Sequence, residues 1–473
     1  MIKELILTFR EDMDVQHGNE GEIFIQNEAV FINIEKPSAG TKAFIEKLDK
    51  DGATEDDLSD AFIRCDGMEH ASVFYYYLEK FARLGMLCRT IHDGETPFAT
   101  MEPFSYNFRW TDDFSINDGP FIMSRFALIR RERNRFILES PLTSCRILMH
   151  HPKCSEIIHY LSKEFRADDI CDNIPDIDRH ILHMFLAMLS NSGFISECDH
   201  RGLHPEDENE VLRQWEFQDL LFHSFHRTGR NNYPHGASYP FADKIEPRPP
   251  YKKPMTDKGL DLFTPDMERL QMEDYPLTLV MEERKSIRSY GDKPITVDQL
   301  GEFLYRSYRI KEVKNIAADD MYDLTVRPCA GGGACYELEI YPVVNQCDGL
   351  SSGIYHYDAL NHKLHQLTER NDTVELLLKH AHSSAAKNCT PEVLILITAR
   401  FQRVSWKYSG MAYAAILKNV GALYQNMYLV ATAMELAPCA LGCGDSEMLC
   451  HAAGLDYLVE SPVGEFMIGS KRI

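Results

Sequence analysis

The segment WKYSGMAYAAILKNVGALYQNMYLVATAMEL, residues 406–436, contains the most apolar stretch of this 473-residue chain. Its apolar core, residues 419–434, is too short to cross a bilayer and includes three amide side chains: Asn419, Gln425 and Asn426. The segment therefore predicts one long, largely buried helix and not a membrane span.

The sequence around this helix predicts a mixture of helices and strands. Residues 337–344 (ELEIYPVV) and 393–398 (VLILIT) are apolar enough to be central strands, and residues 353–367 alternate as a hairpin does. Residues 277–283 have a helical pattern, and Thr296 is expected to cap a further helix, VDQLGEFLYRSY. The second half of the chain is therefore expected to be one α+β domain.

Two stretches of the first half repeat the same order of elements. Residues 24–34 (FIQNEAVFINI) and 126–138 (FALIRRERNRFIL) each predict a hairpin. Helical segments follow, and each copy ends in a helix, a glycine suited to a left-handed helix end, and a short apolar strand. The copies match at a spacing of 108 residues, in the pairs Leu78 and Leu186, Phe81 and Leu189, and Gly85 and Gly193. The first half is therefore predicted to be a duplication.

Hairpin, helices and a final helix–glycine–strand unit are typical of a winged-helix module, which binds either DNA or a peptide strand. The chain has a formal net charge of −22, and its expected recognition helices, 73–84 and 178–190, contain few strong bases. Nucleic acid is therefore not expected as a partner. Peptide binding and a purely structural role both remain open.

A polar, proline-rich connector separates the two halves. Residues 206–210 (EDENE) lead into an expected helix, 211–223, after which prolines accumulate up to Pro254. The predicted division of the chain is a first winged-helix module at 1–105, a second at 106–200, the connector at 201–255 and the mixed domain at 256–473.

Thirteen cysteines are scattered along the chain, and no secretion signal is apparent at its start. We therefore expect reduced thiols and a cytoplasmic location. The cluster Cys439, Cys443, Cys450 and His451 has no standard zinc spacing, so no metal site is predicted.

Three motifs of the second half could bind a ligand or take part in catalysis. Arg284, Ser286 and Arg288 could converge on a phosphate. The sequence RPCAGGG, residues 327–333, could bring its backbone close to a flat ligand or an anion, but it lacks the spacing of a P-loop or of a dinucleotide fold. Lys407 directly precedes Tyr408 and could lower the pKa of that phenol, which would suit an acid or base.

Together these motifs resemble the azoline dehydrogenases of the nitroreductase-like flavin fold, the SagB-type family that includes the cyanobactin oxidases. The resemblance covers roughly the last 260 residues. It consists of QWEFQDLLFHSFHRTGR (214–230), ERKSIRSY (283–290), RPCAGGGACYELEIYPV (327–343), GIYHYD (353–358) and the long-helix segment (406–436). The N-terminal repeats resemble the winged-helix recognition elements of peptide-modifying enzymes.

The resemblance implies an FMN-dependent oxidoreductase and a homodimer with a flavin at each subunit boundary. It implies phosphate and ribityl contacts from Arg284, Ser286 and Arg288, with Lys471 or Arg472 from the C-terminal strand. It implies ring contacts from Pro328, Cys329, Gly331, Gly332 and Asn426. It also implies that Lys407 and Tyr408 are the acid/base pair, without saying which of them holds the proton.

The reaction implied is removal of two electrons and two protons from a peptide azoline, with a thiazoline made from cysteine as the expected ring and oxygen reoxidising the flavin. The partner would be an azoline-containing precursor peptide. Two alternatives are an NAD(P)H-dependent nitro- or quinone reductase on the same fold and a non-catalytic peptide-binding protein. The duplicated N-terminal modules argue against the reductase, and retention of Arg284, Arg288, Lys407 and Tyr408 argues against loss of catalysis.

Overall fold

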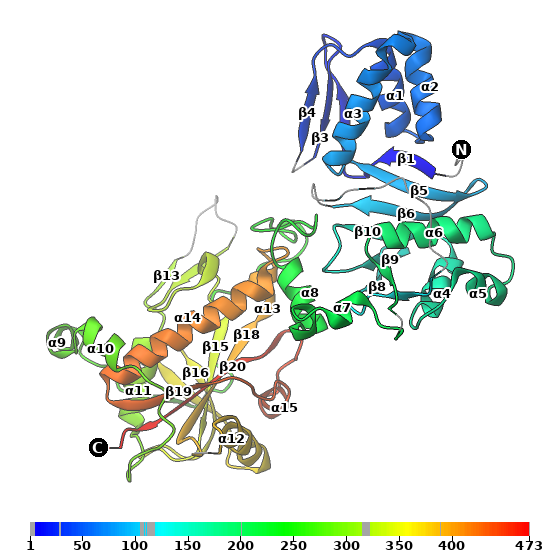
Figure 1. Ribbon diagram of the computed structural model, residues 1–473. Helices are drawn as coiled ribbons and strands as arrows, with labels where there is room; N and C mark the ends of the chain where they lie inside the picture. Colours follow the sequence, from blue (N-terminus) through cyan, green and yellow to red (C-terminus); the bar gives the residue numbers. More distant parts are fainter. Residues whose placement is uncertain are drawn as a thin grey trace. The chain divides into compact units, whose positions relative to one another are not determined.

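The computed structural model describes residues 5–27, 30–104, 108, 110, 119–199, 201–314, 322–387 and 389–472. The chain forms two compact units, Met1–Tyr233 and Pro234–Ile473, coloured blue to green and green to red in Figure 1. The division between the units falls inside the predicted connector, 201–255. We describe each unit by itself.

The first module of unit 1 has the order of elements expected from the sequence. Three antiparallel strands, β2, β3 and β4, are followed by three helices, α1, α2 and α3. Ser38 and Thr54 accept hydrogen bonds from backbone N–H groups in the first turns of α1 and α2, which fixes where these helices begin. The bounds are β2 Asp14–His17, β3 Ile23–Gln26, β4 Phe31–Ile34, α1 Ala39–Asp49, α2 Glu55–Asp66 and α3 Ala71–Arg83.

The second module repeats this order with three strands, β8, β9 and β10, and three helices, α4, α5 and α6. Helices α3 and α6 both begin and both end 108 positions apart, and Gly85 and Gly193, just beyond their ends, both have positive φ. The duplication predicted from the sequence is therefore confirmed. The bounds are β8 Leu128–Glu132, β9 Arg135–Glu139, β10 Cys145–Met149, α4 Pro152–Tyr160, α5 Ala167–Asn173 and α6 Arg179–Asn191.

The two modules share one six-stranded sheet, in the order β1-β5-β6-β10-β9-β8. Strand β6 (Thr96–Pro103) follows the first module and pairs antiparallel with β10 of the second, with Met101 opposite Ile147. The third strand of the second module therefore already has a partner on its outer side. The corresponding strand of the first module, β4, has no strand on its outer side among the described residues. The other elements here are β1 Leu5–Phe9, β5 Leu87–Asp93, β7 Phe121–Met123 and β11 Ile195–Glu197.

The helix expected at 211–223 is divided. A single 3₁₀ turn, η2 (Leu212–Gln214), is followed by Trp215 in an extended conformation, and helix α8 begins only at Phe217 and ends at Phe225. The extended residue interrupts the helical hydrogen bonds, which hydropathy alone does not reveal. A short helix, α7 (Pro205–Glu208), precedes this turn.

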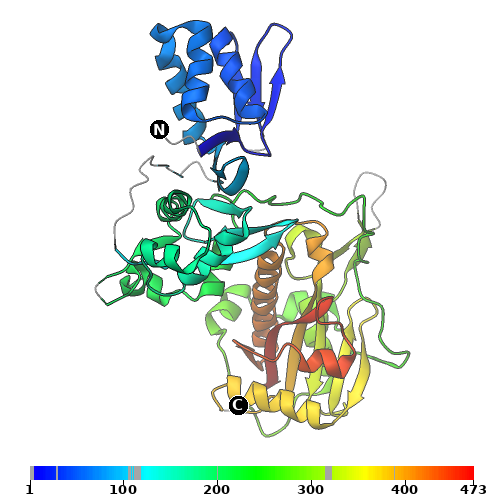
Figure 2. The same cartoon turned by 90° about the vertical axis from the view of Figure 1, so that its right-hand side faces the viewer.

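Unit 2 is built on a seven-stranded sheet in the order β12-β17-β16-β15-β18-β20-β19. Helices α11 and α14 pack on one face, and α12 and α15 pack on the other (Figures 1 and 2). The strands are β12 Gly259–Asp261, β15 Leu338–Val344, β16 Gly353–Asp358, β17 Lys363–Glu369, β18 Val393–Arg400, β19 Leu436–Leu441 and β20 Glu460–Ser470. The helices are α9 Met267–Glu273, α10 Leu277–Glu283, α11 Val297–Tyr308, α12 Asp372–Ser384, α13 Phe401–Ser405, α14 Ala412–Ala433 and α15 Met448–Ala453.

The strands and helices expected in this half are present. Thr296 caps α11 through a capping box with Gln299, and α14 is the long helix expected within 406–436. A small sheet of β13 (Glu312–Lys314) and β14 (Leu324–Val326) and a 3₁₀ turn, η3 (Gly332–Ala334), lie outside the main sheet. No described helix has both the length and the apolarity that a membrane crossing needs. The described residues contain no metal-binding group of acidic, histidine and cysteine side chains, and all thirteen cysteines are free.

Candidate functional site

Lys407 lies between α13 and α14, where its side chain is surrounded by tyrosines. Its ammonium nitrogen donates to the hydroxyl of Tyr322 at 2.7 Å and to the carbonyl of Gly333 at 3.3 Å. The ring centres of Tyr322, Tyr408 and Tyr239 lie 5.1, 5.4 and 5.8 Å from this nitrogen. Three aromatic faces and two oxygen acceptors favour the charged form of the lysine.

The glycine-rich loop needs its glycines because of what surrounds it. A Cβ atom on Gly331 would lie 2.8 Å from the ring of Tyr336, and one on Gly333 would collide with the hydroxyl of Tyr408. Gly333 also has a φ of 58°, which favours glycine. The loop can therefore place the Gly333 carbonyl against Tyr322, whose hydroxyl donates to it at 2.9 Å.

Asn419 of α14 connects this loop to a buried carboxyl group. Its side-chain oxygen accepts from the N–H of Gly332 at 2.9 Å, and its amide nitrogen donates to Glu337 at 2.9 Å. Glu337 is completely buried, and burial raises its pKa. The sequence pointed to Asn426 as the helix residue near the cofactor. The amide of Asn426 donates to the carbonyl of Ser307 at 2.7 Å, and its place near a cofactor stays a prediction.

The pKa values of the Lys407 group differ from the sequence-based expectation. Burial by itself lowers the pKa of Lys407, but the hydrogen bond to Tyr322 and the neighbouring tyrosines raise it above its ordinary value overall. Burial raises the pKa of Tyr408, and the nearby Lys407 offsets this only in part. Burial also raises the pKa of Tyr322 to about 12. The net shift of Tyr408 is therefore upward, because desolvation outweighs the ammonium.

Part of the predicted connector forms a wall of this site. The N–H of Tyr239 donates to the carbonyl of Lys407 at 3.1 Å, and Gly236 forms an isolated antiparallel bridge with Ser409. The indole N–H of Trp406 donates to the carbonyl of Ile245 at 2.6 Å. Residues 236–245 thus hold the backbone of the Lys-Tyr segment, a role that no local motif in the connector indicates.

Arg284 and Ser286 lie beside the second half of α14. The guanidinium of Arg284 lies 5.2 Å from the ring centre of Tyr428, and the hydroxyl of Ser286 is 2.7 Å from that of Tyr428. The chain directly after β20 reaches the same segment, because Lys471 forms an isolated bridge with Tyr290. Within the described chain, no carboxylate forms an ion pair with any of four cations here: Arg284, Arg288, Lys471 and Arg472. Cations without a carboxylate partner on these two adjoining segments, in a chain of net charge −22, suit a phosphate group.

The Arg284–Ser286 segment and the glycine loop contact opposite sides of α14. Asn419, which binds the loop, and Tyr428, which binds Ser286, are nine residues apart. Nine residues are two and a half helical turns, so the two side chains leave the helix on opposite sides, about 13.5 Å apart along its axis. In a single copy, the glycine loop and the Arg284–Ser286 segment therefore contact different sides of this helix.

Cys329, which follows Pro328 in this loop, is buried, and burial raises the pKa of its thiol to about 12, so the thiol is neutral. Its carbonyl accepts from the hydroxyl of Tyr336 at 3.2 Å. Arg327 is buried with its guanidinium 4.3 Å from the ring centre of Tyr308. Tyr322, Asn419, Glu337 and Arg327 are thus additions to the site. The one sequence signal for Asn419 was that it is a polar residue within an apolar helix segment.

Three family models match consecutive parts of the chain. The helix-turn-helix domain of the cyanobactin oxidase ThcOx matches residues 1–111, the cyanobactin oxidase ThcOx matches 121–232, and the nitroreductase family matches 281–470. The chain resembles the cyanobactin oxidases. The N-terminal helix-turn-helix domain and the C-terminal nitroreductase fold are confirmed, and the chain contains an oxidoreductase domain.

Individual relatives match about two fifths to one half of the chain. A protein of Methanocaldococcus jannaschii named as a nitroreductase is 25% identical over 186 residues, which are 39% of this chain and 84% of that protein. A nitroreductase structure from Ralstonia eutropha is 17% identical, with a TM-score of 0.36, and the match covers 51% of this chain and all of that one. The Escherichia coli microcin synthetase complex McbBCD, solved with truncated pro-MccB17 bound, is 16% identical, with a TM-score of 0.32, over 50% of this chain and 89% of that one.

Proposed function

We propose that this protein uses FMN to oxidise azoline rings of peptides, especially thiazolines made from cysteine, to azoles in ribosomal peptide natural-product biosynthesis, with oxygen as the electron acceptor. The observation that carries the proposal is the position of Lys407, which Tyr322 holds against the glycine-rich loop. The cyanobactin oxidase and nitroreductase family matches support the same reaction class.

The residues present fit FMN. Arg284, Arg288, Lys471 and Arg472 would hold its phosphate, with Ser286 as a hydroxyl donor. The loop of Pro328, Cys329, Gly331 and Gly332 would lie against the flavin ring, oriented by Asn419. FMN has its phosphate and its flat ring at opposite ends, which suits two separate groups of contacts.

A second copy of the chain would complete each flavin site. The loop and the Arg284–Ser286 segment contact opposite sides of α14, so the loop of one copy would face the cations of the other. Helix α14 has an exposed stripe that such a partner would cover: Tyr413, Leu417, Gly421 and Gln425. Three apolar residues of α10, Leu277, Leu279 and Met281, are also exposed. We therefore propose a homodimer.

Lys407 and Tyr408 would act on the substrate proton. Azole formation removes a proton from the α-carbon and a hydride from the neighbouring carbon of the ring. When bound, FMN supplies the acceptor for the hydride. Lys407 donates to two oxygens and is already protonated, so we assign the proton transfer to Tyr408. Tyr408 would accept the proton as its phenolate and become a neutral phenol; burial raises its pKa, which makes the phenolate the stronger base, and the ammonium of Lys407 would stabilise it.

The precursor peptide would bind to the N-terminal modules. Strand β6 of this chain pairs with the third strand of the second module and shows how an extended segment is accommodated there. In the first module the equivalent strand, β4, lacks such a neighbour among the described residues. An extended peptide could therefore pair with β4.

Spectroscopy combined with a thiazoline assay tests the proposal. The purified protein should show the two visible flavin bands, release FMN on denaturation, and convert a synthetic thiazoline peptide to the thiazole with consumption of oxygen. Rapid flavin reduction by NADH or NADPH without peptide oxidation would favour a nitro- or quinone reductase. A colourless protein that does not take up added FMN would contradict both activities.

A further inference from the structure

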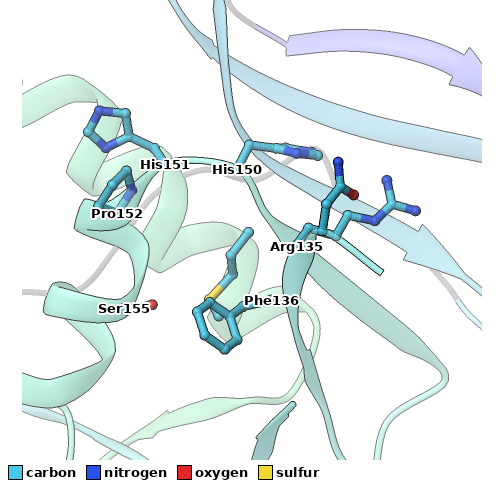
Figure 3. A pocket seen from close by; sticks show the side chains of 8 residues that line it. Arg135, Phe136, His150, His151, Pro152 and Ser155 are labelled. Carbon is cyan, nitrogen blue, oxygen red and sulfur yellow. The ribbon is translucent and has the colours of Figure 1, made fainter. Parts of the chain in front are cut away.

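Unit 1 contains a pocket of about 490 Å³ beside the β8–β9 hairpin. Figure 3 shows Arg135 and His150 on one side of it, His151 and Pro152 at the start of α4 on another, and Phe136 between them. The pocket is remote in sequence from every proposed flavin contact, and the proposed reaction has no use for it.

One wall of this pocket is apolar and accessible. Phe136 is 51% exposed, although it lies on the face of the sheet that packs against the helices, next to Met149 of β10. Arg131, opposite Phe136 on β8, lies on the same face, and Ile129 two residues before it is 41% exposed. The apolar face of the sheet therefore continues past the helices that cover the rest of it.

The rest of the lining is mostly polar, and its one guanidinium, that of Arg135, shares its charge with Glu11. Arg135 enters the pocket with its guanidinium bonded to Glu11 at 3.0 and 3.3 Å. Burial lowers the pKa of His150, which favours its neutral form, and its ring nitrogen is 2.9 Å from the hydroxyl of Thr100. His151 caps α4 by accepting from the N–H of Lys153, which places the positive end of the helix dipole at the pocket.

The hairpin next to the pocket is the most basic short segment of an acidic chain. Four arginines occur within residues 130–135 (RRERNR). Arg130 is paired with Glu132 and Glu139. Arg131 and Arg133 are exposed, and no carboxylate of the described chain forms an ion pair with either of them.

Strand β8 also ends the six-stranded sheet, and no described strand pairs with its outer edge. An open edge with alternating accessible side chains is a template for an extended peptide. A basic hairpin selects acidic residues in such a peptide through charge complementarity.

We propose that the β8–β9 hairpin and its pocket bind an extended acidic segment of the precursor peptide. One acidic side chain would enter the pocket, with its carboxylate toward Arg135 and the start of α4 and its methylene groups against Phe136 and Met149. This inference rests on the proposed function, since it assumes that the substrate is a peptide. The hairpin site would be a second contact for the precursor peptide, separate from β4, and it would bind an acidic segment.

Nucleic acid is the competing partner for a basic hairpin on a winged-helix module. A DNA-reading module needs an accessible, basic recognition helix. Eight of the 13 residues of α6 are buried, and its one arginine, Arg179, is paired with Asp168. The helix therefore has neither the accessibility nor the free charge for base reading, and the acidic peptide is favoured.

Fluorescence anisotropy with the full-length protein tests this site. The probe is a fluorescein-labelled eight-residue peptide in which glutamate alternates with leucine or phenylalanine. We expect binding that weakens about tenfold in the double variant Arg131→Glu, Arg133→Glu and that weakens with added salt. The matched control changes two exposed lysines of the first module, Lys36→Glu and Lys47→Glu, and should leave binding unchanged. Phe136→Ser should weaken binding without changing its salt dependence.

Equal binding by the native protein and the arginine variant would overturn the proposal. So would tighter binding of a 16-base-pair DNA duplex at the same hairpin, or full displacement of the probe by inorganic phosphate at millimolar concentration. Turnover of a short thiazoline peptide is measured on the same samples. Binding without turnover contradicts the proposed function alone, and turnover without binding contradicts only this docking site.

Discussion

The ammonium nitrogen of Lys407 lies 2.7 Å from the phenolic oxygen of Tyr322, a residue 85 positions earlier in the chain. The same hydroxyl donates to the carbonyl of Gly333 at 2.9 Å. Because Tyr322 uses its own proton toward Gly333, it accepts from Lys407, and this hydrogen bond contributes to the raised pKa of the lysine. One tyrosine therefore couples the Lys-Tyr segment to the glycine-rich loop.

Replacing Lys407 by alanine or Tyr408 by phenylalanine should lower azole formation by about 10²- to 10⁴-fold, because each change removes a group proposed to stabilise or accept the proton. Flavin content should stay the same, since neither side chain is a proposed FMN ligand. Initial rates with a thiazoline peptide and the visible absorbance of the same samples measure the two effects. Lys418→Ala, at an exposed position of α14, is the control. Native turnover in both variants would remove these residues from the mechanism.

The variant Tyr322→Phe should move the alkaline limb of the pH–rate profile to lower pH by about one unit. The hydrogen bond to Tyr322 raises the pKa of Lys407, so the ammonium persists as the pH rises toward that value. Loss of a hydrogen bond to a charged group corresponds to roughly one pKa unit or more. A fall in rate with an unchanged profile would indicate that Tyr322 is only structural.

Asn419→Ala should weaken FMN binding about tenfold, because it leaves the Gly332 N–H and the buried Glu337 without their shared partner. Asn426→Ala is the matched comparison on the same helix, since its amide binds Ser307 and not the loop. FMN affinity is read from quenching of flavin fluorescence on titration. A larger effect from Asn426→Ala would support the residue chosen from the sequence and place Asn419 outside the flavin site.

Glu465→Gln should stabilise the protein above neutral pH. Burial raises the pKa of Glu465 to about 7, above its ordinary value near 4.5. The folded state therefore favours the protonated carboxyl, and this contribution is present in full below pH 4.5 and is lost as the pH rises through 7. At pH 8 the variant should gain at most about 3 kcal/mol over the native chain. Midpoints of urea unfolding at pH 4.5 and pH 8 measure this difference, and an equal gain at both would exclude the ionisation as its cause.

Removing unit 1, residues 1–233, should lower kcat/KM about tenfold or more for long, leader-bearing peptides and leave short thiazoline peptides nearly unaffected. The cut follows the division into compact units and keeps residues 236–245, which hold the Lys-Tyr segment. Competition between the long and the short peptide in one reaction gives the ratio of their kcat/KM values directly. An equal loss for both would favour a scaffolding role for the winged-helix modules.

The sequence by itself determined the elements whose causes are local. The 108-residue duplication, the cap at Thr296 and the glycines that end α3 and α6 follow from the preferences of neighbouring residues, and the structure confirms each of them. The nitroreductase-like fold also followed from ordered motifs, and the family matches confirm it.

Only the tertiary structure decided which polar groups meet. Asn419 and Asn426 are seven residues apart and so share one side of α14, and helical periodicity could not choose between them. The contact of Tyr322 with Lys407 and the pairing of β6 with β10 join distant segments that have no local signal. The upward pKa shift of Tyr408 depends on burial, which packing of the whole domain creates and which the adjacent lysine cannot overcome.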